Sequence, residues 1–373
     1  MSNVNARGPA WVYFKGTDVA NPPLWKIKDD GTGLYHIGEG QPDGPQSTGG
    51  TPFVVSDPKG GPAWVYFHGT GPFGIGKLWK IKDDGTGLYH IGSGDGKQGQ
   101  LTNCSPFVVP DPKGGPAWVY FVQSGVYGTL CKIKDDGTGL YHIGTGEGKS
   151  GAQYAASTPF VIPDPNGGPA WVYYQGTDTT LWKIRDDGTG LYHIGTGEGK
   201  AGPQYTNAVP FVVADPHGGP ATVYYKGSDV LNPPLWKIRD DGTGLYAIGY
   251  GQRDGVQFTA ATPFVVPDPA GGPATVYFKG TDVANPALWK IKDDGTDLVR
   301  IGAGTPAGPQ STGATPFVVP DPDGGPATVY YPGTEAANPP LWTIRDDGTR
   351  LYRIGYGQKA GPQSTDATPF VVR

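Results

Sequence analysis

Short runs of apolar and aromatic residues recur along the whole chain, and residues that favour turns separate them. In one stretch, the runs 52–55, 64–67, 78–81 and 88–92 are rich in Val, Ile, Trp, Tyr and Phe, which favour β-strands. Asp, Pro and Gly separate the first two runs, and Asp-Asp-Gly-Thr-Gly separates the last two, as in tight hairpin turns. No window has the apolar period of a helix. The pattern therefore predicts units of four short antiparallel strands.

This block of sequence occurs seven times, with a period of 51 to 54 residues. Its tetrapeptide Pro-Phe-Val-Val/Ile begins at Pro52, Pro106, Pro159, Pro210, Pro263, Pro316 and Pro369. Repeated four-stranded units of this length are typical of β-propeller blades. The sequence therefore predicts an all-β, seven-bladed β-propeller that forms a single domain over residues 1–373. A parallel β-helix is the alternative, but its turns are shorter and lack tight Asp-Gly hairpins.

The two ends of the sequence predict how the ring closes. The first repeat begins with its second strand, at Trp11, whereas residues 369–372 form a first strand with nothing after it. We therefore expect the C-terminal strand to complete the first blade, which leaves no open sheet edge. An open solenoid would instead need polar capping repeats.

Composition excludes several classes of protein. Gly (63) and Pro (39) are abundant, but their fixed period and an aromatic content of 12% indicate turns and not disorder. The net charge of −5 offers no basic surface for nucleic acid, and no apolar run approaches the ~20 residues of a membrane helix. Residues 1–10 lack a secretory signal, so we expect synthesis in the cytoplasm, with any export by another route.

Catalysis requires one asymmetric constellation, whereas almost every polar feature here is repeated five to seven times. The sequence therefore predicts that the chain is not an enzyme and that it needs no cofactor. Cys104 and Cys131 are too few for a disulfide framework, and a small buried thiol is favoured over a Cys–His nucleophile. The Asp-Asp-Gly-Thr segments are interpreted as hairpins and not as metal loops. The dispersed fourth-strand histidines, interpreted as lying on a solvated outer strand, predict no metal site; they are His36, His90, His142 and His193.

Two positions stand out as candidates for ligand binding. A Trp begins the third strand of six repeats: Trp25, Trp79, Trp182, Trp236, Trp289 and Trp342. A Gln lies six residues before the Pro of the first strand in all seven variable connectors: Gln46, Gln100, Gln153, Gln204, Gln257, Gln310 and Gln363. In an antiparallel meander, both positions and the loop between the second and third strands lie at the same end.

An indole beside hydrogen-bonding groups suits a sugar, whose C–H face packs on the ring while amides and carboxylates contact its hydroxyls. Loop carboxylates such as Asp18, Asp178, Asp229 and Asp282 lie at the same end. The structural alternative is equally open: the Trp packs between blades, and the Gln fixes the inter-blade junction. A second Trp, at the start of the second strand, becomes Thr in the last three repeats, so it is expected near a surface at the opposite end, as a second ligand surface or a partner patch. These residues are Trp11, Trp64, Trp118, Trp171, Thr222, Thr275 and Thr328.

Across all seven repeats the chain resembles the bacterial seven-bladed β-propeller lectins, closest to the Burkholderia lectin of this type and more distantly the tachylectin propeller. The segments 158–165, 171–174, 181–184 and 191–195 carry the resemblance. It implies monosaccharide pockets between blades for fucose-like and related sugars. The third repeat departs from the pattern because Cys131 stands in place of Trp.

We therefore expect a multivalent lectin that binds glycans, without nucleic acid and without membrane insertion. A protein- or peptide-binding propeller without sugar affinity is the alternative. A propeller hydrolase is a third hypothesis, and it would need unique acidic or His residues that converge at the channel.

Overall fold

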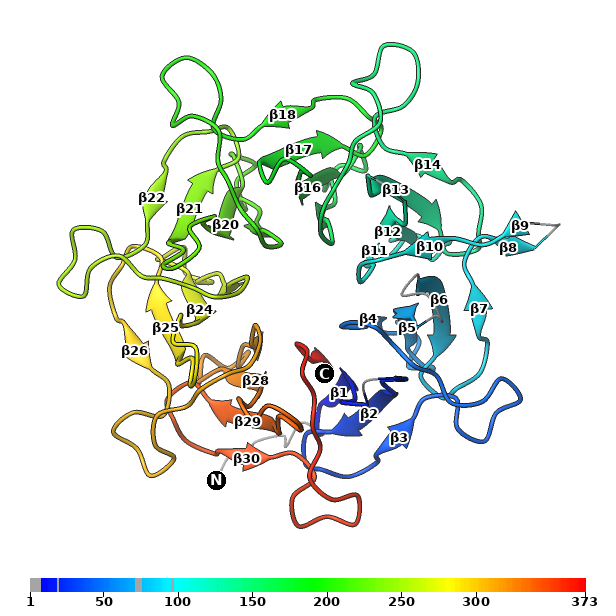
Figure 1. Cartoon of the computed structure of the whole chain (residues 1–373), viewed down its shortest axis with the longest axis vertical. Helices are drawn as coiled ribbons and strands as arrows, with labels where there is room; N and C mark the ends of the chain where they lie inside the picture. Colours follow the sequence, from blue (N-terminus) through cyan, green and yellow to red (C-terminus); the bar gives the residue numbers. More distant parts are fainter. Residues whose placement is uncertain (1–7, 19, 71–75, 95–96, 126) are drawn as a thin grey trace.

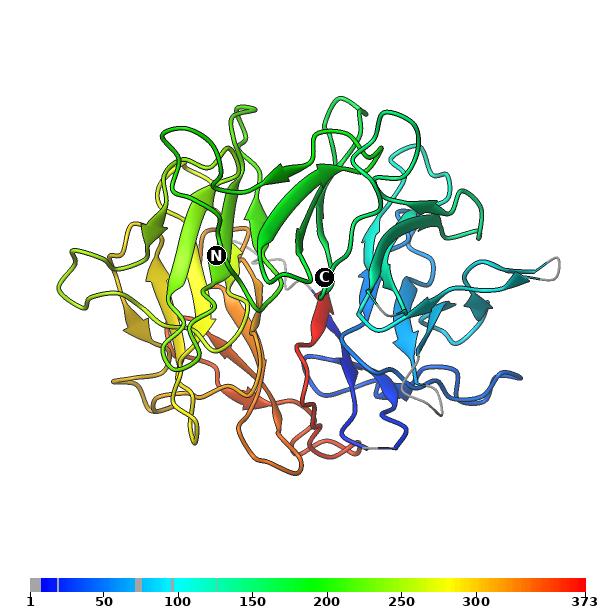
Figure 2. The ribbon, with the colours of Figure 1, turned by 45° about the horizontal axis from the view of Figure 1, so that its top comes forward.

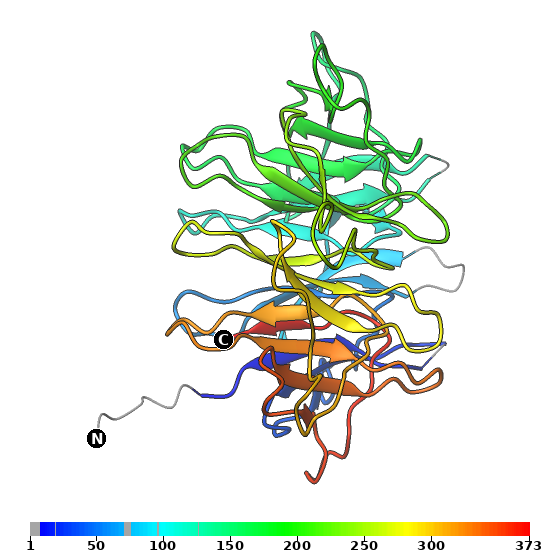
Figure 3. The ribbon, with the colours of Figure 1, turned by 90° about the vertical axis from the view of Figure 1, so that its left-hand side faces the viewer.

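The computed structural model describes residues 8–18, 20–70, 76–94, 97–125 and 127–373. Within these ranges the chain is all-β: its regular elements are strands, paired in repeated antiparallel sheets. The sheets are arranged around a centre (Figure 1), and the tilted view shows the same ring from another side (Figure 2). In the side view the strands run across the thickness of the disc (Figure 3). No helix in the described ranges is long and apolar enough to cross a membrane.

Each repeat contributes an inner, a second, a third and an outer strand. The inner strands are β4 (Phe53–Val55), β11 (Phe107–Val109), β15 (Phe160–Ile162), β19 (Phe211–Val213), β23 (Phe264–Val266), β27 (Phe317–Val319) and β31 (Phe370–Val372). The second strands are β1 (Trp11–Lys15), β5 (Trp64–Gly69), β12 (Trp118–Gln123), β16 (Trp171–Gln175), β20 (Thr222–Lys226), β24 (Thr275–Lys279) and β28 (Thr328–Pro332). The third strands are β2 (Leu24–Lys28), β6 (Gly76–Lys82), β13 (Thr129–Lys134), β17 (Leu181–Arg185), β21 (Leu235–Arg239), β25 (Leu288–Lys292) and β29 (Leu341–Arg345). The outer strands are β3 (Tyr35–His36), β7 (Tyr89–His90), β14 (Tyr141–His142), β18 (Tyr192–His193), β22 (Tyr246–Ala247), β26 (Val299–Arg300) and β30 (Tyr352–Arg353).

The sheet of repeat 1 combines both ends of the described chain. It has the order β3-β2-β1-β31, and Val12 of β1 pairs with Val371 of β31. Repeats 2 to 7 begin with β4, β11, β15, β19, β23 and β27, and each repeat pairs its strands in chain order. Repeats 2 and 3 belong to one nine-stranded sheet because β10 (Leu101–Thr102) pairs with both β6 and β12. The connector of repeat 2 also forms a two-stranded sheet of β8 (Ser93–Gly94) and β9 (Lys97–Gln98).

The core lies between neighbouring sheets and around the centre. Between repeats 1 and 2, for example, Tyr13 and Ile37 pack with Val65 and Ile81, all at most 1% exposed. At the centre, inner-strand phenylalanines contact their neighbours with ring centroids 5.0–5.3 Å apart, and the chain of contacts closes on itself. The ring consists of Phe53, Phe107, Phe160, Phe211, Phe264, Phe317 and Phe370. Burial of aliphatic and aromatic surface at the contacts between sheets therefore stabilises the ring.

A buried polar clamp also joins each repeat to the next. Its acceptor is the first Asp of each Asp-Asp-Gly-Thr turn, a residue that sequence analysis assigned only to a hairpin. Between repeats 3 and 4, the Tyr120 hydroxyl donates to Asp186 Oδ2 at 2.6 Å, and Lys132 Nζ lies 2.9 Å from the same oxygen. Desolvation raises the pKa of the Tyr120 hydroxyl, and the charge of Asp186 raises it further. The equivalent pairs are Tyr13–Asp83, Tyr66–Asp135, Tyr173–Asp240, Tyr224–Asp293, Tyr277–Asp346 and Tyr330–Asp29.

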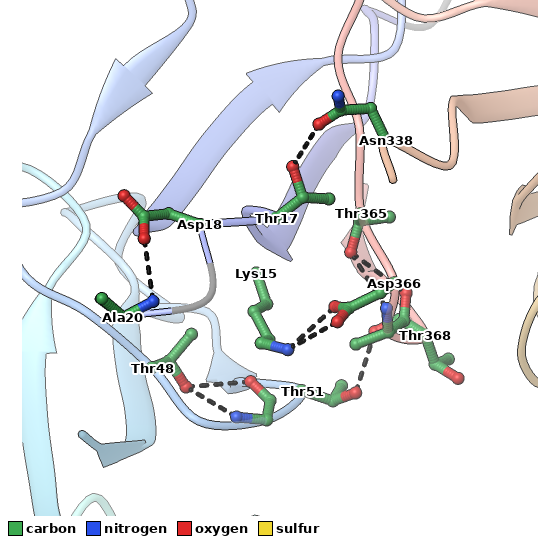
Figure 4. A network of polar contacts seen from close by, with 12 residues as sticks. Lys15, Thr17, Asp18, Ala20, Thr48, Thr51, Asn338, Thr365, Asp366 and Thr368 are labelled. Carbon is green, nitrogen blue, oxygen red and sulfur yellow. Dashed lines mark hydrogen bonds and ion pairs between the residues drawn. The ribbon is translucent and has the colours of Figure 1, made fainter. Parts of the chain in front are cut away.

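Contacts between repeats 7 and 1 close the ring. The Tyr330 hydroxyl donates to Asp29 at 2.7 Å, as in the other clamps, but Thr343 stands where the other repeats have the lysine. On the face shown in Figure 4, Lys15 Nζ lies 2.9 Å from Asp366, whose segment leads into β31. The Thr368 hydroxyl, just before β31, donates to the Thr315 carbonyl of repeat 7 at 2.9 Å, and its own carbonyl accepts from the Thr51 hydroxyl of repeat 2 at 2.9 Å (Figure 4). The fold is therefore a closed, β-propeller-like ring of repeated four-stranded sheets.

Candidate functional site

The connector between repeats lies between two neighbouring sheets. In the connector from repeat 1 to repeat 2, Ser47 forms a β-bridge with Pro23 beside β2, and Thr48 forms one with Gly69 of β5. The same pattern of bridges recurs at other junctions. The connector, the start of a third strand and the end of a second strand therefore meet at one end of the strands, as the sequence predicted.

The connector glutamines hold these segments in place. The Gln46 amide donates to the Asp43 and Gly44 carbonyls at 3.2 and 2.9 Å, which closes the connector onto itself. Its main chain bonds the Leu24 and Ile37 backbone, so the residue is anchored to its own repeat. At three junctions the amide oxygen also accepts a hydrogen bond from a second-strand Tyr of the next repeat. These pairs are Gln153–Tyr174, Gln204–Tyr225 and Gln310–Tyr331.

The remaining junctions carry Phe at the position of that Tyr, namely Phe14, Phe67, Phe121 and Phe278. A phenyl ring has no hydroxyl to donate, so at these junctions the amide oxygen lacks the Tyr hydrogen bond. The Gln amide nitrogen thus has the same structural role at each junction for which its hydrogen bonds are described. The hydrogen-bond partner of the amide oxygen, in contrast, differs from one junction to another.

The third-strand indoles lie against glycine at the same junctions. A Cβ on Gly69 would lie 2.8 Å from Trp79 Cδ1, closer than real Cβ contacts, so the indole requires glycine there. The six Trp are half-buried, and each packs in the apolar cluster that its repeat shares with the preceding one. The glycines that contact them are Gly16, Gly69, Gly176, Gly227, Gly280 and Gly333.

The outer-strand histidines contact these indoles. The Trp182 and His193 rings stack at 4.2 Å with an interplanar angle of 16°, and Trp79 and His90 stack at 4.7 Å. His90 Nε2 lies 3.0 Å from the Gln100 carbonyl oxygen. Burial lowers the pKa of both imidazoles. Cross-strand pairing thus places His36, His90 and His193 of the outer strands on a Trp, a contact that the sequence-based interpretation did not include, whereas His142 pairs with Cys131.

A pocket of about 310 Å³ brings the predicted Trp and Gln positions together between repeats 1 and 2. Its polar lining includes Gln46 and Lys77, and its apolar lining includes Phe67 and Trp79, with Gly69 beneath the indole. The Gln therefore shares a pocket with the Trp of the following repeat, not with the Trp of its own. An aromatic surface with an amide and an ammonium at its edge suits a small polar ligand.

The loop carboxylates play a local role. Trp182 Nε1 donates to the Thr180 hydroxyl at 2.6 Å, and that hydroxyl donates to Asp178 at 2.6 Å. Desolvation opposes ionisation of Asp178, but hydrogen bonds from Thr180 and Trp182 outweigh it, so the pKa of its carboxyl is lowered. Asp18 and Asp229 instead accept backbone hydrogen bonds within their own loops. The Asp178 relay thus fixes the orientation of one indole.

Repeat 3 lacks this arrangement because both the Trp and the glycine beneath it are replaced. Cys131 replaces the Trp, and Gln123 replaces the glycine beneath it. The Gln123 amide donates to the Gln100 side-chain oxygen at 3.3 Å, so a side chain now extends from the position where glycine would accommodate an indole. Cys131 is buried, and desolvation raises the pKa of its thiol to about 12. Both cysteines are free thiols.

No family model and no curated protein sequence matches this chain. Solved structures do resemble it. An apocarotenoid oxygenase from Synechocystis is 13% identical, with a TM-score of 0.52 over 98% of this chain and 93% of that one. A candidate 6-phosphogluconolactonase from Bacteroides fragilis is 12% identical, with a TM-score of 0.50 over the whole of both chains. A puromycin-hydrolysing peptidase from Mycobacterium tuberculosis is 10% identical, with a TM-score of 0.50 over 92% of this chain and 52% of that one. At these identities the likeness concerns the fold alone, which is β-propeller-like.

These structures correct one expectation. Repetition of the polar residues predicted that the chain is not an enzyme, yet propeller-like structures similar to it include proteins described as a lactonase and an oxygenase. Enzymes with this fold therefore exist, and the prediction that repetition of the polar residues excludes an enzyme is contradicted. None of these three structures is described as a lectin, so the lectin resemblance stays a prediction.

Proposed function

We propose that this protein is a multivalent carbohydrate-binding protein, built as seven blades with one repeat in each, whose shallow pockets at the blade junctions take monosaccharide units of glycans. Fucose-like sugars are the first ligands to test, because the resemblance to bacterial propeller lectins points to them. The observation that carries the proposal is the junction pocket of about 310 Å³ lined by Gln46, Phe67, Lys77 and Trp79.

Its dimensions and chemistry support a sugar. A pyranose presents a C–H face to an aromatic ring, and its hydroxyls both donate and accept hydrogen bonds. The Gln46 side-chain oxygen can accept and the Lys77 ammonium can donate. Trp79 and Phe67 supply the apolar surface. Gly69 allows the indole to lie close to the backbone, and we expect the terminal sugar of a glycan chain to pack on the exposed side of the ring.

Repetition supports multivalency. Six repeats carry the Trp–Gly pair, whereas repeat 3 carries Cys131 and Gln123 instead. Up to six related sites, which differ in the partner of the Gln oxygen and in the residue at the position of Lys77, would on one rigid ring convert weak single-site binding into strong attachment to a surface that bears many glycans. The closed phenylalanine ring and the inter-repeat clamps support the rigidity that such avidity requires.

A glycan array read with and without competing free L-fucose or other monosaccharides tests this proposal. We expect binding that free sugar abolishes and that Trp182→Ala weakens. Trp171→Ala is the matched control, because Trp171 belongs to the same repeat but lies at the opposite end of its strands. Equal loss in the two variants, or no binding to any array glycan, would count against sugar binding. A partner with a single stoichiometry and no sugar competition would favour the peptide-binding alternative.

A further inference from the structure

At the opposite end of the strands, two cations enclose an indole. In repeat 2, the ring centroid of Trp64 lies 4.6 Å from Lys80 Nζ and 5.6 Å from Lys82 Nζ. A Cβ on Gly87 would lie 3.3 Å from the same ring, and Gly87 has a left-handed φ of 68°, so glycine suits the position beneath the indole. Cations at such distances attract the face of an aromatic ring. The other examples are Trp11 with Lys26 and Lys28, Trp118 with Lys132 and Lys134, and Trp171 with Lys183 and Arg185.

Repeat 6 retains the cations but has lost the ring. Thr275 stands where those repeats have Trp, and Val299 stands where they have an outer-strand Tyr that faces the first cation. Lys290 and Lys292 remain in register at the end of β25. A pocket of about 400 Å³ now lies between these residues. Asp297 and Asp346 also line it, and Lys290 Nζ lies 3.1 Å from Asp346, as the first lysines of repeats 1 to 5 lie beside the equivalent Asp. We call this pocket the repeat 6 slot.

The glycine has changed together with the Trp. Asp297 occupies the position of Gly87 and keeps its left-handed backbone, with φ of 55°. Such a conformation is unfavourable for a residue other than glycine, at a cost of about 1 kcal/mol or more. An indole at position 275 would also lie tightly against a Cβ at 297, as the 3.3 Å distance at Gly87 indicates. The Asp297 carboxylate thus lines the slot where repeats 1 to 4 have an indole, and the chain accepts an unfavourable backbone conformation at this residue.

The other two repeats with Thr differ from this arrangement. In repeat 5, the Arg239 side chain lies over Gly244, with its Cγ 3.7 Å from the place of a Cβ. In repeat 7, Thr343 replaces the first cation. In repeat 6, Lys292 Nζ bonds the Thr275 hydroxyl at 3.1 Å, so the ammonium lies over the threonine that replaced the ring.

We propose that the repeat 6 slot binds an aromatic ring of about the size of an indole, held between Lys290 and Lys292 as the chain holds its own indoles in repeats 1 to 4. A larger depression of about 640 Å³ adjoins the slot, since Thr275 and Lys292 line both. Proline-rich turns at Pro267 and Pro320 form its walls, and it gives substituents on the ring a path to solvent. The ring belongs either to a small aromatic compound or to a Trp side chain exposed on a partner.

Titration with indole, followed by calorimetry and ligand-observed NMR, tests the slot. We expect saturable binding that L-fucose does not displace. The double variant Thr275→Trp with Asp297→Gly writes the residues of repeats 1 to 4 into repeat 6, so it should weaken this binding by about tenfold or more. Conversely, Trp64→Thr vacates the slot of repeat 2, whose two cations, Lys80 and Lys82, are lysines as in repeat 6, and it should add one indole site. A short Trp-containing peptide, set against the same peptide with Ala, distinguishes a partner side chain from a free aromatic compound.

The proposal is overturned if indole shows no saturation up to about 10 mM. It is equally overturned if the filled variant, folded as judged by circular dichroism, binds indole as the parent does. If the filled variant does not fold, the decision rests on Trp64→Thr, and an unchanged number of indole sites contradicts the proposal. None of these results depends on whether the junction pockets bind sugar.

Discussion

Removal of one hydroxyl from an inter-repeat clamp should measurably weaken the ring. Tyr120 is 1% exposed, and its hydroxyl donates to the ionised Asp186 at 2.6 Å. A hydrogen bond to a charged group contributes about 1.5–3 kcal/mol. In Tyr120→Phe, Asp186 keeps its contact with Lys132 and accepts from the Ala170 amide, so the carboxylate is not left alone. We therefore expect a loss of about 1.5–3 kcal/mol in the free energy of unfolding.

Denaturant unfolding followed by tryptophan fluorescence measures this loss. Tyr250→Phe is the control, because Tyr250 is 70% exposed and its change should stay within about 0.5 kcal/mol. Asp186→Asn should cost more than Tyr120→Phe, since it leaves Lys132, 13% exposed, without a charged partner. If Tyr120→Phe unfolds at the same denaturant concentration as Tyr250→Phe, the clamp does not stabilise the ring as argued.

Three further outcomes follow from the contacts described above. Gly176→Ala places a Cβ 3.0 Å from the Trp182 ring and against the Asp178 carboxylate, so thermal unfolding should show a loss of about 1–3 kcal/mol in stability. Gly125→Ala is the control: its Cβ would lie in open space, and it should leave the stability unchanged. Because burial raises the pKa of the Cys131 thiol to about 12, that thiol should resist an aromatic disulfide reagent at pH 8 until the protein is unfolded, and rapid labelling of the native protein would contradict the packing of repeat 3. Burial lowers the pKa values of His68, His90 and His193, so near pH 6 the unfolded chain binds more protons than the folded protein. The free energy of unfolding should therefore fall as the pH falls from about 7.5 to about 5.5. A rise over that range would refute the burial of these imidazoles.

Most of the fold could be predicted from the sequence because its information is local and repeated. Alternating β-branched and aromatic runs, together with Asp-Gly hairpins, specify the strands, and the pairing of Val12 with Val371 agrees with the expected completion of the first sheet. Outer strands were predicted too long: residues 88–92 shorten to Tyr89–His90, because the chain turns at once into the connector, where Ile91 bonds Gln100.

Interactions between distant repeats were harder to predict. The partner of Asp186 is Tyr120, 66 residues earlier, and nothing in the Asp-Asp-Gly-Thr turn itself indicates that its first carboxylate faces another sheet. Stacking of His on Trp likewise depends on cross-strand register. One signal was available, however: Gly becomes Gln123 in the same repeat in which Trp becomes Cys131, and two coupled changes of this kind indicate contact.

The most direct test of the account exchanges that pair of residues between repeats and counts L-fucose sites by calorimetry. Gly69→Gln with Trp79→Cys writes the residues of repeat 3 into repeat 2, and Gln123→Gly with Cys131→Trp does the reverse. If the junction pockets bind the sugar, the first exchange should remove one site per chain and the second should add one, with the affinity of the other sites unchanged. An identical number of sites in both exchanged proteins and the parent would contradict the claim that the Trp–Gly pair forms the binding pocket.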